Sequence, residues 1–140
     1  IREATPMTDC IFCRIVAGEI PCKQVYADDT AIAFLDLAPF KTGHTLVVPR
    51  AHVADALSDA EVLASIAPAV VATGRLLTER LGASGLNIVS NVGEDAGQSV
   101  FHLHAHLVPR YADDPGMAAL LTSAASSDLN AVHSRLTEGR

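Results

Sequence analysis

Three histidines stand within five residues of one another, at His102, His104 and His106, and single apolar residues separate them. Side chains of a β-strand alternate between the two faces of a sheet, so a strand here places the imidazoles on one face and Leu103 and Ala105 on the other. Neighbouring imidazoles are then about 6.6 Å apart at the backbone, close enough for two or three to contact one phosphate or metal ion. A solvent-exposed polar face that contains histidine by chance is the alternative. The strict alternation favours a functional site.

A glycine-rich segment, residues 91–99, directly precedes the histidines. Gly93 and Gly97 allow backbone N–H groups to approach an anion, and Ser99 adds a hydroxyl group. An ordinary glycine-rich connection between two strands explains these residues about as well. The position immediately before the histidines favours a contact with an anion.

Two of the three cysteines, Cys10 and Cys13, are three residues apart at the start of an expected helix. Both side chains then lie on one side of the helix, where two thiolates supply half of a tetrahedral zinc site. A redox pair and plain burial are the alternatives, although the strand that precedes a thioredoxin-type motif is missing. An odd number of cysteines argues against a disulfide framework, and we expect the remaining one, Cys22, to be a small core residue.

The other histidines are harder to interpret. His44 and His52 each stand at the end of an expected strand. Their positions alone do not distinguish an ordinary polar residue from one that acts beside the histidine row. We expect His133, in a weak last helix, to lie at the surface.

The elements that must position these residues follow from hydrophobic periodicity. Asp9 is a candidate N-cap for a short helix that ends at Gly18. Alternating or β-branched runs predict strands, with a tight hairpin at residues 27–30. The expected strands are 23–26, 31–35, 44–49, 86–91 and 99–108.

A long helix is the clearest element in the sequence. Ser58 and Glu61 have the spacing of a capping box, and apolar residues recur at helical spacing as far as Leu81, before Gly82. Pro68 interrupts this pattern, so we expect a kink or a split there. From Ala118 the chain is rich in alanine and serine, and the spacing of Leu129, Val132 and Leu136 predicts a final short helix.

Hairpin-linked strands around one long and one or two short helices predict an α+β fold with a five-stranded antiparallel sheet. A sheet this small leaves edges that a second copy could cover, so we expect a homodimer.

Length and composition set limits on the function. The chain has 140 residues, a formal net charge of -6 and 49% hydrophobic residues. It is therefore expected to form one domain over residues 7–140, while residues 1–6, which precede Met7, are expected to be a cloning remnant outside the fold. Ten basic residues against sixteen acidic ones, with no basic run, argue against long nucleic acid as a partner. We see no apolar run of membrane-spanning length and no secretory leader, and we expect a cytoplasmic protein.

The sequence resembles the histidine triad (HIT) family, whose signature is three histidines separated by single apolar residues. The resemblance extends over most of residues 9–111 and is closest to the nucleotide-binding (Hint) branch, chiefly because Gly97-Gln98-Ser99 directly precedes the histidines. The tail, 112–140, has no counterpart in the family motifs. The matching blocks are Cys10–Ile15, Gly18–Pro21, Ala33–Asp36, Gly43–Pro49, Gly97–Phe101 and the histidines themselves.

The resemblance implies a purine nucleotide site and a two-step displacement at the α-phosphorus. By this analogy, His104 attacks phosphorus to form a nucleotidyl-histidine, and water then releases the nucleoside monophosphate. His106 and Ser99 would contact the phosphate or the leaving group, and His44 would support the histidines from an adjacent strand.

The resemblance also implies the remaining contacts. Asp36 corresponds to the residue that accepts hydrogen bonds from the ribose hydroxyls. The other implied nucleotide contacts are Ile11, Phe12, Phe34 and Leu37 around the base, together with Asn91, Gly97 and Gln98. In metal-containing relatives, a structural zinc ion takes two thiols and two histidines, which correspond here to Cys10, Cys13, His52 and His102.

These implications make hydrolysis of nucleoside phosphoramidates, or of related AMP conjugates, the leading expectation. The alternatives are a dinucleoside polyphosphate hydrolase or nucleotidyltransferase, and a non-catalytic nucleotide-binding or zinc-stabilised interaction module.

Overall fold

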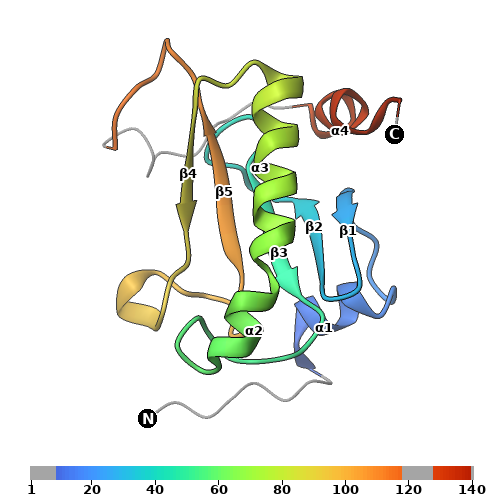
Figure 1. The fold of residues 1–140 in the computed structure, drawn as a ribbon, viewed down its shortest axis with the longest axis vertical. Helices are drawn as coiled ribbons and strands as arrows, with labels where there is room; N and C mark the ends of the chain where they lie inside the picture. The colour runs from blue at the N-terminus through green and yellow to red at the C-terminus, as the bar shows by residue number, and fades with distance from the viewer. Residues whose placement is uncertain (1–8, 118–127, 140) are drawn as a thin grey trace.

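A single antiparallel sheet organises the structure, a computed structural model that describes residues 9–117 and 128–139. The strand order is β1-β2-β3-β5-β4, so β1 and β4 are the edges (Figure 1). The predicted α+β fold with a five-stranded antiparallel sheet is confirmed. The strands are β1 (Gln24–Ala27), β2 (Ala31–Leu35), β3 (Thr45–Pro49), β4 (Gly85–Val89) and β5 (Ala105–Arg110).

Helices cover both faces of this sheet. The long helix α3 crosses one face, with α2 before it and α4 beside β1, whereas α1 packs on the other face (Figure 1). The described α-helices are α1 (Ile11–Val16), α2 (Ala60–Ser65), α3 (Ala67–Leu81) and α4 (Leu129–Thr137), and a short 3₁₀ helix, η2 (Glu94–Ala96), follows β4.

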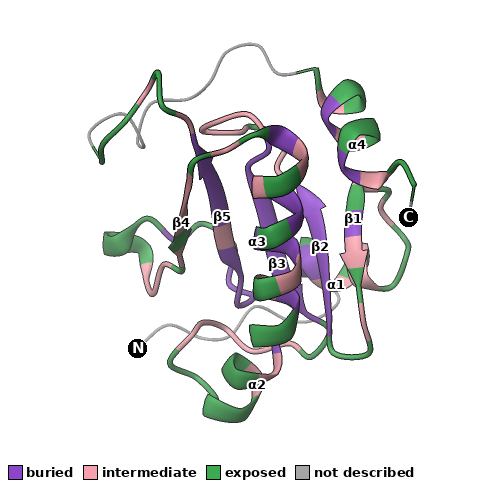
Figure 2. Cartoon of the chain, turned by 45° about the horizontal axis from the view of Figure 1, so that its top comes forward, coloured by how far each residue is buried: buried purple, intermediate pink, exposed green. Residues whose placement is uncertain are grey.

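Two apolar clusters hold the layers together. The larger one lies between the sheet and α3 and includes Leu77, Leu103 and Leu107, each fully buried. The smaller one lies between the sheet and α1 and includes Phe12 and Phe34. Figure 2 shows the central strands buried and the outer side of α3 exposed.

The starts of two helices differ from prediction. The N-cap of α1 is Cys10 rather than Asp9, since the Cys10 thiol accepts from the backbone N–H of Cys13. The N-cap of α2 is Asp59, whose carboxylate accepts from two backbone N–H groups, whereas Ser58 donates to Asp55 in the preceding turn. A carboxylate one residue further along satisfies the first N–H groups of α2, so no Ser58–Glu61 capping box forms.

The predicted interruption at Pro68 is confirmed. Helix α2 ends at Ser65, and α3 begins at Ala67 with the proline in its first turn, where a missing N–H costs no hydrogen bond. Although the combined run from Ala60 to Leu81 is long and apolar enough to cross a membrane, α3 packs against the sheet as a core helix.

The predicted strand over residues 99–108 is wrong in its first half. Strand β5 begins only at Ala105, because its neighbour β3 ends at Pro49, which has no N–H to donate. The preceding segment is fixed by the loop after β3 instead, where the Leu103 N–H donates to the Val53 carbonyl at 2.8 Å. His102 and His104 therefore lie before the strand, and only His106 lies in it.

The remaining elements lie close to their predicted positions. The other four strands begin and end within about two residues of expectation, and the last helix is present as α4. His133 is partly exposed at the surface, and its Nε2 donates to the Gln24 carbonyl at 2.7 Å, which joins α4 to β1. Residues 1–8 and the alanine- and serine-rich part of the tail, 118–127, lie outside the described residues.

Candidate functional site

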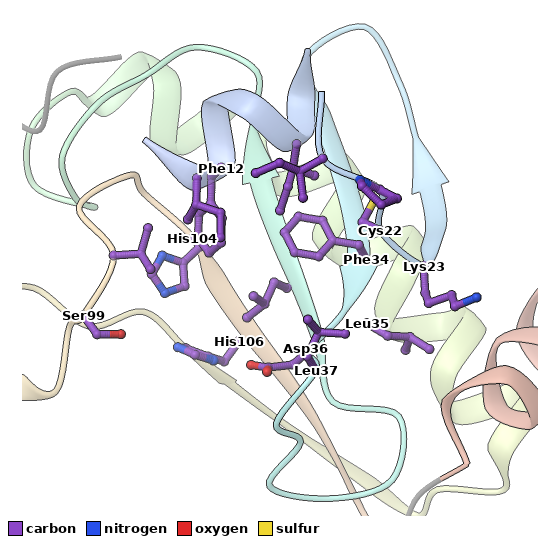
Figure 3. A pocket seen from close by; sticks show the side chains of 16 residues that line it. Phe12, Cys22, Lys23, Phe34, Leu35, Asp36, Leu37, Ser99, His104 and His106 are labelled. Carbon is purple, nitrogen blue, oxygen red and sulfur yellow. The ribbon is translucent and has the colours of Figure 1, made fainter. Parts of the chain in front are cut away.

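A cavity of about 290 Å³ opens between α1 and the sheet, on the face that carries His104 and His106 (Figure 3). Apolar side chains form most of its wall. The structure brings the following predicted site residues to this cavity: Ile11, Phe12, Phe34, Asp36, Leu37, Ser99, His104 and His106.

A row of cross-strand neighbours forms the floor of the site. Phe34 of β2 is paired with Leu46 of β3, Leu46 with His106 of β5, and His106 with Val89 of β4. Directly paired residues of adjacent strands point to the same face of a sheet. The sheet register therefore places an imidazole between two apolar stretches.

His104 has its proton position fixed by the backbone. Its Nδ1 lies 2.8 Å from the His102 carbonyl oxygen, which can only accept, so Nδ1 carries the proton and Nε2 keeps its lone pair. Burial lowers the pKa of His104, and the hydrogen bond to the His102 carbonyl opposes that shift. The ring packs against the edge of Phe12 with centroids 5.0 Å apart. His104 is thus a neutral imidazole with a free basic nitrogen at the cavity.

His106 has the opposite arrangement. The Phe40 N–H donates to His44 Nδ1 at 3.0 Å, so the proton of a neutral His44 is on Nε2. That Nε2–H donates to His106 Nδ1 at 2.9 Å, which leaves the proton of His106 on its own Nε2. Burial, and then the neighbouring His104 and His44, lower the pKa of His106 to about 4, against a smaller opposing effect of Asp36. A lone pair and an N–H donor therefore stand side by side, on rings 5.0 Å apart.

Asp36 follows β2 at the rim of the same cavity (Figure 3). One carboxylate oxygen accepts from the Ala38 N–H at 2.8 Å, and the other lies 3.6 Å from His44 Nε2. Gly43, directly before His44, has a φ of +88° and a Cβ there would overlap Leu81 of α3, so only glycine fits this close turn against the helix. The carboxylate is held in place and keeps acceptor capacity for a ligand.

The two cysteines and two histidines predicted as metal ligands come together on the other side of Phe12. Their donor atoms all lie within 4.8 Å of one another. The two Nδ1 atoms of His52 and His102 are 3.1 Å apart. The Cys13 thiol lies 3.2 Å and 3.5 Å from these atoms, and the Cys10 thiol lies 3.4 Å from His102 Nδ1. Tetrahedral zinc bonds of about 2.0 to 2.3 Å imply ligand separations of roughly 3.3 to 3.8 Å, close to these distances.

The chemistry of these donors also fits a cation. His102 Nε2 donates to the Pro49 carbonyl at 2.8 Å, so its Nδ1 lone pair faces the cluster. Burial, and then a hydrogen bond with Cys10 and its charge, raise the pKa of the Cys13 thiol to about 11. A thiolate there requires a nearby positive charge, which a bound metal would supply. The cluster could therefore hold a metal ion.

Asp36, His44 and His106 also lie within metal-binding distance of one another. Because His44 Nδ1 accepts from the Phe40 amide, the Nε2 that faces the group carries a proton and is not available as a ligand. This second cluster is better described as a chain of hydrogen bonds.

Three predicted contacts lie elsewhere. Asn91 and Gly97 line a separate cavity beyond His106. Gln98 lines neither of these cavities, and its side-chain amide joins its own loop to the loop after β3. Its Nε2 donates to the Ala54 and Val100 carbonyls, and its Oε1 accepts from the Gly93 N–H. The geometry assigns the Gln98 side chain to holding the loop, and its predicted nucleotide contact stays a prediction.

Sequence reasoning missed several residues of the cavity wall. Ile15 lies one helical turn after Ile11, so helical periodicity could have found it. Leu46 is identified only by its register with Phe34 and His106. Cys22 was expected in the core but lies half-buried in this wall, and no local pattern indicates that position.

Comparison with known proteins matches residues 17–113 to the family described as HIT domain. The chain is 42% identical over 113 residues to "Protein hit" of Bacillus subtilis, which covers 80% of this chain and 78% of that protein. It is 40% identical over 110 residues to adenosine 5'-monophosphoramidase hnt1 of Schizosaccharomyces pombe, covering 77% of this chain and 79% of that protein.

Solved structures agree with this result. A zinc-bound histidine triad family protein from Mycobacterium smegmatis superposes with a TM-score of 0.79 at 34% identity. The match covers 94% of this chain and 95% of that one.

Proposed function

The chain belongs to the HIT domain family of nucleotide hydrolases, and from this premise we propose that it hydrolyses nucleoside phosphoramidates or related conjugates of AMP. The observation that carries the proposal is the pairing at the cavity of an imidazole lone pair, on His104 Nε2, with an imidazole donor, on His106 Nε2. Attack on phosphorus needs the first, and the charge that develops on the phosphoryl oxygens is stabilised by the second.

The cavity supports a nucleoside monophosphate with its base near α1. Phe12 and Phe34 meet edge to face, with centroids 5.7 Å apart, and give the inner wall an apolar aromatic surface. Asp36 lines the same cavity near His106 (Figure 3), and its carboxylate would accept hydrogen bonds from the ribose hydroxyls. Ser99 and the neighbouring backbone then contact the phosphate.

The reaction proceeds in two displacements. The His104 Nε2 lone pair forms a bond to phosphorus as the bond from phosphorus to the amine nitrogen breaks. The amine takes the electron pair of the broken bond and gains a proton from the donors at this end of the cavity, His106 Nε2–H or the Ser99 hydroxyl.

Water then attacks the phosphorus of the nucleotidyl-histidine, and the electron pair returns to His104. One water proton restores the donor, and the products are AMP and the free amine. The carbonyl of His102 holds the proton on Nδ1 throughout and stabilises the cation formed by the first step.

We propose zinc as the metal and a structural role for it, because four protein ligands leave no position for water. Cys10 and Cys13 belong to the start of α1, while His52 and His102 come from the two loops that border the sheet. Bound zinc would join the six-residue α1, which carries one wall of the cavity, to those loops.

The test is incubation of the purified protein with adenosine 5'-phosphoramidate, with AMP release followed by chromatography. Samples quenched in denaturant at alkaline pH, where the bond between phosphorus and histidine survives, should contain protein whose mass is increased by one adenylyl group. His104→Ala should give neither product nor adduct. Turnover that persists in this variant would contradict the mechanism.

The alternative functions give different results in the same assay. Faster cleavage of diadenosine polyphosphate than of AMP-amine conjugates would favour a dinucleoside polyphosphate hydrolase. AMP binding without turnover on any phosphoramidate would favour a non-catalytic binding module.

We also propose that the protein is a homodimer. Strand β4 is an edge, and its Ile88 side chain is 60% exposed beside Leu63 and Val71, which are exposed too. Sedimentation equilibrium of the wild-type protein should give twice the mass of one chain. The Ile88→Arg variant should give the mass of a single chain. A monomeric wild-type protein would overturn this proposal.

A further inference from the structure

A second cavity, of about 180 Å³, lies against the far side of His106. Val89 and Val108 line its base, and Phe40 and Ala96 its walls, so that most of its surface is apolar. An apolar cavity of about 150 Å³ is large enough to bind benzene. The second cavity therefore has room for a phenyl ring or a short alkyl chain.

The sheet register fixes how the two cavities lie relative to each other. His106 is paired with Leu46 on one side and with Val89 on the other, all facing the same way. Leu46 lines the first cavity, Val89 lines the second, and His106 lines both. A group bound at His106 is therefore flanked by two apolar spaces along one line across the sheet.

The geometry of displacement says which space belongs to the leaving group. In an in-line attack, the leaving atom departs on the side of phosphorus opposite to the nucleophile. His106 lines both cavities and His104 only the first, so a phosphorus held at the two histidines borders the second cavity on a side where the nucleophile does not lie. With the nucleoside in the first cavity and phosphorus at the two histidines, the substituent that departs points toward the second cavity.

We propose that this second cavity is a leaving-group subsite that selects conjugates in which AMP is joined to an apolar alkyl or aryl amine. The inference rests on the proposed function, because it assumes that the nucleoside occupies the first cavity. The inference adds the chemical class of the leaving group that is joined to AMP in the substrate. Asn91, at the same cavity, offers an amide for the polar atom that joins the substituent to phosphorus.

Phe40 links the subsite to the chemistry. Its ring stacks on His106, with an interplanar angle of 19° and centroids 6.3 Å apart, while its N–H holds His44. The Phe40 N–H fixes the tautomer of His44, and His44 in turn fixes the proton of His106 on Nε2. A substituent that packs on the Phe40 ring therefore contacts the residue at the start of this hydrogen-bond chain.

The experiment measures binding, so that it does not depend on turnover. The probes are AMP and its methyl and benzyl phosphate esters, with dissociation constants measured by calorimetry on the wild-type protein. We expect the benzyl ester to bind at least about tenfold more tightly than the methyl ester, since the ring leaves water for an apolar space. Equal affinities for the two esters would overturn the subsite. If AMP itself does not bind, it is the proposed function that fails, and the subsite fails with it.

Two variants in one short helix locate the effect. Ala96→Leu fills the cavity and should reduce the ratio of the two affinities to about one. Asp95→Leu, at an exposed neighbour outside the cavity wall, is the matched control and should keep the ratio. If the benzyl ester still binds more tightly than the methyl ester in Ala96→Leu, the binding site of the ring is not the second cavity.

A direct measurement on the wild-type protein complements the variants. The methyl NMR signals of Val89 and Val108 should shift with the benzyl ester beyond the shift that AMP causes. Signals that respond equally to AMP and to the benzyl ester overturn the proposal even if Ala96→Leu does not fold.

Discussion

Two pairs of histidines in this protein have nearly the same geometry and opposite chemistry. In the cysteine cluster, His52 and His102 bring two ring nitrogens to 3.1 Å, and beside the cavity His44 and His106 bring two to 2.9 Å. The backbone group at the other ring nitrogen distinguishes them. A carbonyl, that of Pro49, turns the lone pair of His102 toward its neighbours, whereas an amide, that of Phe40, turns a proton of His44 toward His106.

The difference teaches that imidazole clusters are interpreted from their hydrogen-bond partners rather than from their ring separations. Lone pairs that converge with thiols suit a cation. A lone pair followed by a chain of N–H donors suits a phosphoryl group. The four predictions that follow test this distinction, from the largest expected effect to the smallest.

The largest effect is expected on turnover when the proposed nucleophile is removed. His104→Ala should lower kcat by at least about 10³-fold, because the covalent path is lost. Its metal content should stay at the wild-type value when measured by atomic emission, since His104 is not a ligand. A variant that lost both turnover and metal would show that the two clusters are not independent.

The second effect is expected on metal content and stability. Cys13→Ser should lose the metal ion and about 3 kcal/mol of folding free energy, which lowers the Tm by about 10 °C in a chain of this size. Its KM for the nucleotide substrate should rise more than its kcat falls, because α1 carries Phe12 and Ile15 at the cavity.

Cys22→Ser is the matched control for the metal measurement. Cys22 packs against the smaller apolar cluster, between α1 and the sheet, but its thiol is not one of the four possible metal ligands. Metal lost equally from both variants would contradict the assignment of the ligands.

The third effect separates a positioning role from simple packing. His44→Leu removes the donor to His106 Nδ1 and should lower kcat about 10- to 100-fold, as the loss of such supporting hydrogen bonds usually does. His44→Gln keeps an amide donor and should recover most of that loss. The ¹⁵N chemical shifts of His106 should report the Nε2–H tautomer in the wild type and a mixture in His44→Leu. Unchanged shifts would mean that His44 acts only through packing.

The smallest effect is expected from pH. The groups that face His106 are His104, His44 and Asp36, and the pKa of His106 is lowered to about 4 from an ordinary value of 6.5. At this group the unfolded chain therefore binds more protons than the folded one between pH 6.5 and about 4, so the contribution of His106 to the free energy of unfolding falls as pH drops through that range and is constant above it.

Urea midpoints at several pH values measure this slope, and His106→Gln should reduce it. Since burial also lowers the pKa of His104, the acid limb of kcat/KM should lie below pH 6.5. A limb above that value would contradict neutral imidazoles at the site.

Much of the fold could be predicted because local patterns dominate it. Strand β2 and the break before Pro68 agree with prediction, since a short apolar run and a missing N–H are properties of the residues themselves. The errors lie where a distant or competing group decides. Residues 99–104 alternate like a strand, but the neighbouring strand ends at Pro49, and Asp59 takes the cap that Ser58 could have provided.

The site divides in the same way. The alternating histidines and the pair of thiols are identified by residue type and spacing, whereas the roles expected of His44 and His52 follow only from the family resemblance. The second cavity and the position of Cys22 have no local signal, because they arise from the packing of separate segments around His106 and Phe34.

The sequence by itself determined which chemical groups this protein possesses: three alternating histidines, two thiols one helical turn apart and a carboxylate at the end of a strand. Only the tertiary structure decided which nitrogen each imidazole presents. That choice depends on the Pro49 carbonyl, the His102 carbonyl and the Phe40 amide. Every residue but proline has both kinds of backbone group, so only the packing of the chain determines whether an imidazole meets an acceptor or a donor.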